Sequence, residues 1–224
     1  EDVNKADIVF VAVPTPFHGN RKGHDDSAVW ESLKNIQNGK VIVIKSTVLP
    51  GTSDLAAKKF PKKTILFNPE FLIAKNSIQD FLKPERQLVG YTNSKSKKLA
   101  PGVIAILPKA PYERILKARE AEIVKYFGNT FLATRVIFAN QIYDFCKKLG
   151  GVDYNVIKEC VAKDNRIGGS HFDIFADGYR GYGGACLPKD TKAFLAFAKK
   201  LGFKFELLTK VDEINEKLRR KKNR

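Results

Sequence analysis

Three short apolar runs, each rich in β-branched residues, constrain the fold of this chain more than any other feature. They are Ala6 to Val13 (ADIVFVAV), Lys40 to Lys45 (KVIVIK) and Lys63 to Phe67 (KTILF). Continuous apolar runs of strand length are typical of strands buried on both faces of a parallel sheet. Helices are expected between them, one capped by Asp25, Asp26 or Ser27 and running to about Ile36, and the next beginning near Thr52. This alternation predicts an α/β fold with a doubly wound sheet.

A much longer helical pattern follows in the second half of the chain. Residues 119–149 keep helical apolar spacing over about eight turns and stop at a pair of glycines. A helix of that length is expected to act as a spine, joining two domains or packing against a second copy of the chain. Shorter helices are predicted beyond it, near Asn155 to Ala162, over Thr191 to Leu201 and over about Leu207 to Arg219. The second half is therefore expected to be α-helical.

Polar motifs directly follow the expected strands: PTP from Pro14, STVLPGT from Ser46 and FNPEFL from Phe67. In α/β sheets, ligands bind at the carboxyl ends of parallel strands. Glu70 is therefore a candidate general base, since a carboxylate placed there can accept a proton from a bound ligand. Thr47 occupies the corresponding place on its own strand. A turn-capping role is the alternative for both residues.

The segment 181–190 (GYGGACLPKD) is the most unusual loop in the sequence. Its glycines allow tight backbone turns and the close approach of a ligand. A helix beginning near Pro188 would put Cys186 beside the positive end of the helix dipole. With Lys189 nearby, that position favours a nucleophilic thiolate. Asp190 follows one helical turn after the cysteine.

Lys125 and Asn129 form a second candidate pair, on the long predicted helix. They are four residues apart and therefore project from the same helix face. Their flanking residues are apolar, which favours burial of at least one of them over an exposed polar pair. A buried lysine needs an acceptor or an anionic partner, and Asn129 is placed to hold it.

The charge balance allows several partners. The chain has 40 Lys+Arg against 24 Asp+Glu, a net charge of +16, which predicts attraction to polyanions such as nucleic acids or phosphorylated small molecules. The lysines are scattered, and the densest basic run is at residues 217–224, so a solvated surface and tail is the preferred interpretation. Nucleic-acid binding rests on charge alone, because the sequence has no zinc-finger spacing and no interleaved basic and aromatic pattern.

Cysteine and histidine usage sets the cellular expectation. Three cysteines, no signal-like N-terminus and no long apolar run predict a reduced, cytoplasmic setting without a membrane segment. Cys146 and Cys160 fall in expected helices among apolar neighbours, so we interpret both as structural. The histidines match no metal spacing, and no metal site is expected; they are His18, His24 and His171. The chain has no Met and begins just ahead of a strand, so we expect a truncated or incompletely recorded sequence.

Six motifs, in this order, resemble those of the nucleotide-sugar dehydrogenases: VAVPTP, KSTVLPGT, NPEFL, EIVKYFGNTFLAT, DNRIG and GYGGACLPKDTKAF. The resemblance runs from about Ala6 to the end of the chain. It implies a partial Rossmann-like, NAD-binding domain over residues 1–118. It also implies a helical central domain over residues 119–224, which carries a catalytic cysteine and forms a homodimer through residues 119–149.

The resemblance is strongest to members that oxidise UDP-glucose. It implies a four-electron, NAD-dependent oxidation of the sugar C6 hydroxyl to a carboxylate, which gives UDP-glucuronate and uses two NAD+. Cys186 would form a thiohemiacetal and then a thioester. Other members act on GDP-mannose or UDP-N-acetyl-mannosamine, and these substrates remain open alternatives.

The resemblance also implies roles for individual residues. Lys125 would stabilise an oxyanion on C6, with Asn129 orienting it; Thr47 and Asp190 would position a water, and Glu70 would assist thioester hydrolysis. The implied substrate contacts are Glu70, Phe71, Leu72, Lys125, Asn129, Gly183 and, from a neighbouring subunit, Arg166. The implied cofactor contacts are Val13, Thr15, Thr47 and Lys189.

Three features depart from the family pattern. The glycine fingerprint G-x-G-x-x-G, expected on the first strand-to-helix turn, is not in this sequence, and neither is the family's C-terminal domain, which closes over the uridine diphosphate. Ala74 stands four residues after Glu70, where the family has a second glutamate. These departures leave a non-catalytic remnant of the family as a further alternative.

Overall fold

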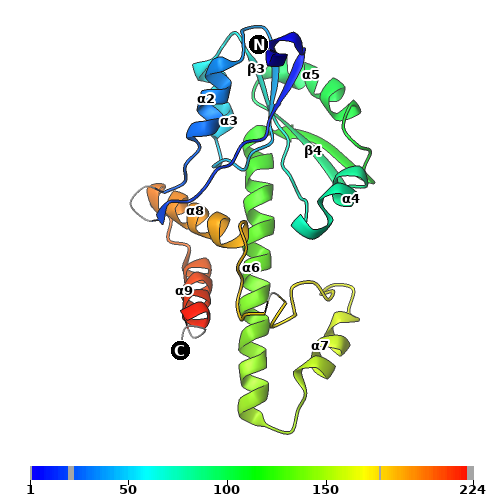
Figure 1. The fold of residues 1–224 in the computed structure, drawn as a ribbon, viewed down its shortest axis with the longest axis vertical. Coiled ribbons are helices and arrows are strands. Elements are labelled where there is room, and N and C mark those ends of the chain that lie inside the picture. Colours follow the sequence, from blue (N-terminus) through cyan, green and yellow to red (C-terminus); the bar gives the residue numbers. More distant parts are fainter. Residues whose placement is uncertain (1, 20–22, 177, 221–224) are drawn as a thin grey trace. The chain divides into compact units, whose positions relative to one another are not determined.

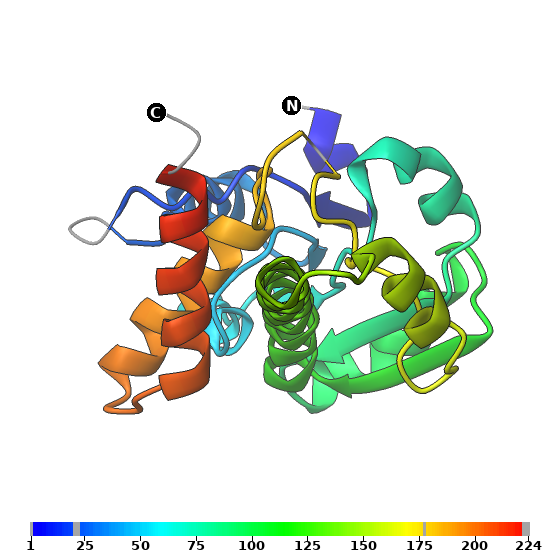
Figure 2. The same ribbon diagram turned by 90° about the horizontal axis from the view of Figure 1, so that it is seen from below.

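The computed structural model describes residues 2–19, 23–176 and 178–220. The chain forms two compact units, Glu1–Tyr126 and Phe127–Arg224. Helix α6 (Ala118–Leu149) contains the boundary between them and is one continuous helix (Figure 1). Figure 2 shows α6 along its axis. Residues 119–149 are thus helical, as the apolar spacing predicts. The domain boundary predicted at residue 118 stays a prediction.

The first unit is built on one sheet of five strands in the order β1-β2-β3-β4-β5. The strands are β1 (Ile8–Val11), β2 (Val41–Ile44), β3 (Thr64–Phe67), β4 (Arg86–Tyr91) and β5 (Tyr112–Lys117). β1, β2 and β3 are parallel, and their register pairs Ile8 with Val41 and Val41 with Thr64. β4 is antiparallel to β3 and parallel to β5. The predicted α/β fold is confirmed, and the sheet is mixed because the chain reverses its direction between β3 and β4.

Helices cover both faces of this sheet, which explains its uninterrupted apolar strands. One core joins alternate strand residues such as Ile42 and Ile65 to α2 (Ser27–Asn35), α3 (Thr52–Lys59) and the start of α6. The other core joins Val43 and Leu66 to α5 (Ser94–Ala105). Three shorter segments complete the unit: η1 (Asp2–Lys5), η2 (Ala74–Asn76) and α4 (Ser77–Leu82).

The second unit is helical, as predicted, and contains α7 (Tyr154–Ala162), α8 (Leu187–Lys200) and α9 (Glu206–Arg220) beside its part of α6. One apolar cluster joins α6 to Tyr182 and α9, and another joins α6 to Tyr154 and Ile174. Cys146 lies buried in the second cluster, in agreement with a structural role. Cys160 is exposed; apolar neighbours along the sequence do not bury it, because it lies on the outer side of α7. All three cysteines are free.

Candidate functional site

The predicted cofactor residues of the first unit meet at the carboxyl ends of β1 and β2. Thr15 is buried, and its hydroxyl donates a 2.8 Å hydrogen bond to the carbonyl of Thr47. The amide of Val13 donates to the hydroxyl of Ser46, also over 2.8 Å. Ser46 was not predicted from the sequence; its place beside Thr47, directly after a strand, is the signal that marks it. The structure therefore brings Val13, Thr15 and Thr47 together, while their roles stay predictions.

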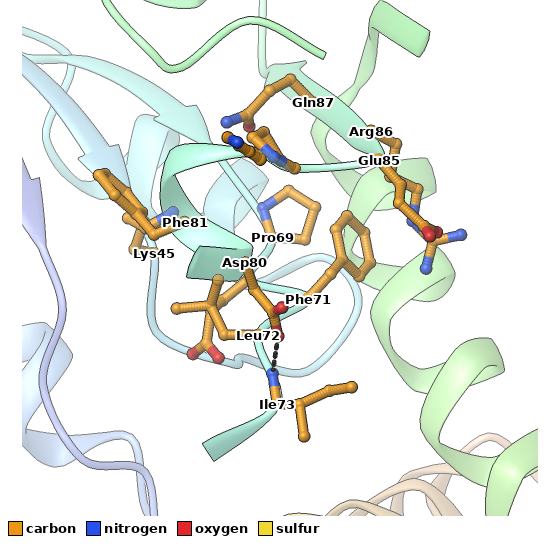
Figure 3. A pocket seen from close by; sticks show the side chains of 13 residues that line it. Lys45, Pro69, Phe71, Leu72, Ile73, Asp80, Phe81, Glu85, Arg86 and Gln87 are labelled. Carbon is orange, nitrogen blue, oxygen red and sulfur yellow. Dashed lines mark hydrogen bonds between the residues drawn. The ribbon is translucent and has the colours of Figure 1, made fainter. Parts of the chain in front are cut away.

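A cavity of about 340 Å³ opens beside the segment that follows β3 (Figure 3). Glu70, Phe71 and Leu72, all predicted substrate contacts, line it. The segment is held to α4 because the Ile73 amide donates to Asp80 Oδ2 over 2.8 Å. The volume falls in the range of small-molecule sites, roughly 300–1,000 Å³. The predicted carboxylate therefore lies on the wall of a concave site.

Lys125 is buried, with 7% of its surface exposed. Its ammonium lies 5.9 Å from the centre of the Phe71 ring. The Arg86 guanidinium lies 3.9 Å from the same ring centre. A ring face attracts a cation, so the aromatic side chain helps to fix the lysine. The expected burial within the Lys125 and Asn129 pair is confirmed for Lys125, and Asn129 is half-buried.

Lys45, at the carboxyl end of β2, is a further cavity residue that was not predicted. Its Nζ donates to Asn68 Oδ1 over 2.7 Å. Burial lowers the pKa of Lys45, the negative charge of Glu70 opposes that change, and the positive charge of Lys125 adds to it. The signal in the sequence is a lysine that ends an otherwise apolar strand.

Asp190 is the centre of the candidate group in the second unit. It is almost fully buried, with 1% of its surface exposed. Its Oδ2 accepts a 2.5 Å hydrogen bond from the Asn129 amide, and its Oδ1 is paired with the Lys189 ammonium, also at 2.5 Å. A buried carboxylate needs such partners to offset the loss of water. Asn129, predicted on the long helix, is thus in direct contact with Asp190, predicted in the cysteine loop together with Lys189.

Cys186 is the N-cap of α8 and is exposed. The helix begins at Leu187 with a proline in its first turn, earlier than the Thr191 start of the predicted helix and in agreement with a start near Pro188. The Asp190 amide donates to the Cys186 carbonyl over 2.9 Å, which closes the first turn. The thiol therefore stands at the positive end of α8, one turn from the buried carboxylate.

Two predicted substrate contacts, Gly183 and Arg166, lie outside this group. A Cβ at Gly183 would collide with the ring of Tyr179, so this ring would have to move to admit any other residue there. Arg166 is exposed and paired with Asp164 at 2.6 Å. That hydrogen bond raises the pKa of Arg166. A contact of Arg166 with a substrate in a neighbouring subunit stays a prediction.

Glu122 is a buried carboxylate that the sequence did not reveal. Its side chain is fully enclosed and accepts hydrogen bonds from the amides of Gly51, at 2.5 Å, and Ser53, at 2.9 Å. It caps the start of α3, where Gly51 has no side chain to do so. Burial raises the pKa of Glu122 to about 7, against the lowering effect of these hydrogen bonds. Glu122 thus connects α6 to the segment that carries Thr47.

Two family models match the chain, one for each part. Residues 1–107 match the NAD binding domain of the UDP-glucose/GDP-mannose dehydrogenase family, and residues 119–217 match the central domain of the same family. The chain therefore belongs to the UDP-glucose/GDP-mannose dehydrogenase family. The members of this family are NAD-dependent oxidoreductases that act on nucleotide sugars.

Individual relatives agree with this assignment. The chain is 35% identical to the UDP-glucose 6-dehydrogenase TuaD of Bacillus subtilis (strain 168), over 97% of this chain and 48% of the relative. The structure of a UDP-glucose dehydrogenase from Pyrobaculum islandicum matches with a TM-score of 0.84 and 34% identity, over 96% of this chain and 51% of that one. The UDP-D-ManNAc dehydrogenase of Pyrococcus horikoshii shares the fold, with a TM-score of 0.82 and 23% identity, over 97% of this chain and 52% of that one. The chain thus spans about half the length of the relatives it matches.

Within the described parts of the chain, no helix combines the length and the apolar character that crossing a lipid bilayer requires.

Proposed function

We propose that this chain carries out the NAD-dependent oxidation of UDP-glucose at C6, which yields UDP-glucuronate. The observation that carries the proposal is the group at the start of α8. The exposed Cys186 thiol stands at the helix N-cap, one turn from Asp190, which is buried and held by Asn129 and Lys189. An accessible thiol beside fixed polar groups is the arrangement that covalent oxidation of an aldehyde requires.

The strand ends of the first unit fit the cofactor. Val13, Thr15 and Thr47 lie at the carboxyl ends of β1 and β2, where doubly wound sheets bind dinucleotides. The Thr15 hydroxyl and the Thr47 carbonyl already fix each other. We assign these three residues, and Lys189, to NAD contacts. Bound NAD+ supplies the acceptor for hydride in both halves of the reaction.

In the first half, the C6 alcohol loses a proton and a hydride and becomes an aldehyde. We assign Thr47 and Asp190 to the water that accepts the proton. Lys125 is assigned to the C6 oxygen, because a buried ammonium can stabilise the negative charge that develops on that oxygen. Asn129, one turn further along α6, orients the oxygen with its amide.

In the second half, the Cys186 sulfur attacks the aldehyde carbon, and a C–S bond forms in a thiohemiacetal. Loss of a hydride and a proton from this adduct leaves a thioester. Water then attacks the thioester carbon, and Glu70 accepts the proton of that water. The C–S bond breaks with the Cys186 sulfur leaving as a thiolate, which takes up a proton and restores the thiol, and the sugar is released as a carboxylate. Each half yields one NADH.

Two relatives support the choice of UDP-glucose as substrate. The Bacillus subtilis and Pyrobaculum islandicum proteins are 35% and 34% identical to this chain, and both are UDP-glucose dehydrogenases by name. The test is NADH formation by the purified chain with UDP-glucose, GDP-mannose or UDP-N-acetyl-mannosamine, with NADH counted per sugar consumed. We expect two NADH per UDP-glucose and a much lower rate with the other sugars. Faster turnover of either alternative would reassign the substrate and keep the chemistry.

Two cysteine variants test the mechanism. Cys186→Ser should abolish acid formation while circular dichroism shows an intact fold. Cys160→Ser is the matched control, because Cys160 is also exposed but lies on α7 away from the group at α8. Full turnover by Cys186→Ser, or no turnover by the folded wild-type chain with any of the three sugars, would refute the proposed function.

We also propose that the chain forms a homodimer through α6. Large apolar side chains of this helix are exposed to solvent: Phe127, Phe131, Phe138, Phe145 and Leu149. At 3.6 residues per turn, these positions fall within about 40° of one another around the helix axis. Their spacings of four and seven residues are those of helices that pair along one seam. A continuous exposed apolar stripe of this kind marks an interaction surface.

A further inference from the structure

The surroundings of Lys45, in the first unit, indicate more than a structural role for this side chain. It directly follows β2, the central strand of the parallel part of the sheet, and it is half-buried. Its ammonium lies 6.0 Å from the centre of the Phe81 ring, and Figure 3 shows the two side chains beside each other. Taking an ammonium out of water is costly unless its charge is used or compensated. A Met or Leu at the end of β2 would fill the same space without that cost.

Asn68 fixes the direction of this lysine. Its side chain is fully buried, and its Nδ2 donates to the carbonyl of Leu88 over 2.8 Å. That bond sets the orientation of the amide, so Oδ1 faces Lys45 and accepts the 2.7 Å hydrogen bond from its Nζ. An ammonium has three donors, and this hydrogen bond uses one. The others remain for the cavity that Lys45 lines.

Glu70 is a carboxylate whose negative charge acts on this ammonium, where it opposes the lowering of the Lys45 pKa that burial causes. It lies two residues beyond Asn68, on the same segment, and lines the same cavity. The other charged groups on the cavity wall are Asp80, Lys83, Glu85 and Arg86. Of these, Lys83, Glu85 and Arg86 are exposed, and Asp80 is bonded to the Ile73 amide. Lys45 is therefore the cation of the wall that is both shielded from solvent and fixed in direction.

We propose that Lys45 is a positioning residue for Glu70: its ammonium, held by Asn68, is the counter-charge that keeps the Glu70 carboxylate aimed into the cavity. The proposal rests on the proposed function, in which Glu70 accepts a proton from the attacking water. It adds a second cation to the one already assigned there. Lys125 serves the oxygen of the substrate, and Lys45 serves the base.

A double-mutant cycle on turnover tests the link between the two residues. Lys45→Met should lower kcat with UDP-glucose by about 10- to 100-fold, the size expected when a catalytic group is misplaced, with little change in KM. In a Glu70→Gln background, Lys45→Met should have almost no further effect, because the group it positions is gone. Lys45→Arg keeps the charge and should restore most of the activity. Lys62→Met, an exposed lysine in the turn before β3, is the control and should behave as wild type.

The four proteins of this cycle are the wild type, Lys45→Met, Glu70→Gln and the double variant. They also allow a second test, which does not depend on enzymatic turnover. In urea unfolding, Lys45→Met should lower the midpoint more when Glu70 is present than when it is Gln, because the carboxylate then loses its counter-charge. A wild-type chain that makes no NADH would refute the proposed function. The unfolding cycle would still decide whether Lys45 and Glu70 interact. Equal midpoint shifts in both backgrounds, or a Lys45→Arg protein no more active than Lys45→Met, would overturn the proposal.

Discussion

The Asn129 amide donates to the Asp190 carboxylate over 2.5 Å and so connects α6 to the first turn of α8. The second carboxylate oxygen is paired with Lys189. Both oxygens of a buried carboxylate are thus engaged, which fixes its orientation one turn from Cys186. Hydrogen bonds to a charged group are stronger than those between neutral groups. Asp190 is therefore fixed by a partner on each of its two carboxylate oxygens.

Removing the negative charge of Asp190 should distinguish its role in catalysis from its contribution to packing. Asp190→Asn keeps the size of the side chain but removes the charge that Lys189 neutralises. We expect kcat for NADH formation to fall by roughly 10²- to 10⁴-fold, the range for loss of a group that handles protons. Asn129→Ala should cost less, because it removes one hydrogen bond and leaves the charge. Steady-state kinetics on both variants, with KM for UDP-glucose recorded, checks this order; equal losses would contradict it.

Glu122 predicts a specific dependence of stability on pH. Its pKa is raised from 4.5 to about 7 in the folded chain, so the folded state binds a proton more tightly than the unfolded state. The contribution of Glu122 to the free energy of unfolding is therefore largest below pH 4.5 and is lost as the pH rises through 7. At 1.36 kcal/mol per pKa unit, the change is about 3 kcal/mol at most.

The measurement is urea unfolding of the wild type and Glu122→Gln between pH 4.5 and 8. The wild type should lose stability relative to the variant as the pH rises, since Gln does not titrate. Other groups titrate equally in both proteins, so the difference isolates Glu122. A difference that stays constant with pH would show that Glu122 does not change its protonation in this range.

The exposed stripe on α6 predicts the assembly state. Phe138→Glu places a charge in the middle of the stripe, and burial of an unpaired charge in a helix seam strongly disfavours association. We expect the wild type to be a dimer by analytical ultracentrifugation and Phe138→Glu to be a folded monomer. Lys147→Glu is the control, because Lys147 is exposed on the opposite side of α6, about 160–180° around the helix axis from the stripe, and should leave the dimer intact. A monomeric wild type would contradict the proposed dimer.

The sequence reveals the parts of this fold that have a strong local pattern. β1, β2 and β3 are continuous apolar runs, and α6 has sustained helical spacing, so both could be predicted. β5 could not: most of its residues are exposed, because it lies at the edge of the sheet and pairs only with β4 among the described strands. α5 contains a proline inside the helix, which hides its pattern.

The candidate site divides in the same way. Cys186, Asp190, Lys125 and Glu70 stand in distinctive motifs and could be found from the residues or from the resemblance. Glu122 could not, because its burial depends on amides that lie as many as 71 residues away in the sequence. Lys45 reads as the polar end of a strand until Asn68, 23 residues later, is seen to hold it. Long-range contacts decide which polar residues are buried, and no local pattern records them.

Gly183 and Gly184, in the cysteine loop, disfavour a larger side chain for different structural causes, and this difference can be tested. A Cβ at Gly183 would collide with the Tyr179 ring, whereas Gly184 has open space but a φ of 72°. Gly183→Ala should lower the free energy of unfolding by roughly 1–3 kcal/mol through overpacking. Gly184→Ala should lower it by about 1 kcal/mol through backbone strain.

Trimming the neighbour distinguishes the two causes. Tyr179→Ala removes the ring, so Gly183→Ala should cost little when made in that background. Gly184→Ala should keep its full cost there, since backbone strain does not depend on Tyr179. Thermal or urea unfolding of the two double variants, each compared with Tyr179→Ala alone, gives these costs directly. If Tyr179→Ala relieved both substitutions equally, or neither, the ring would not be what requires glycine at position 183, and the predicted substrate contact would become the better reason for it.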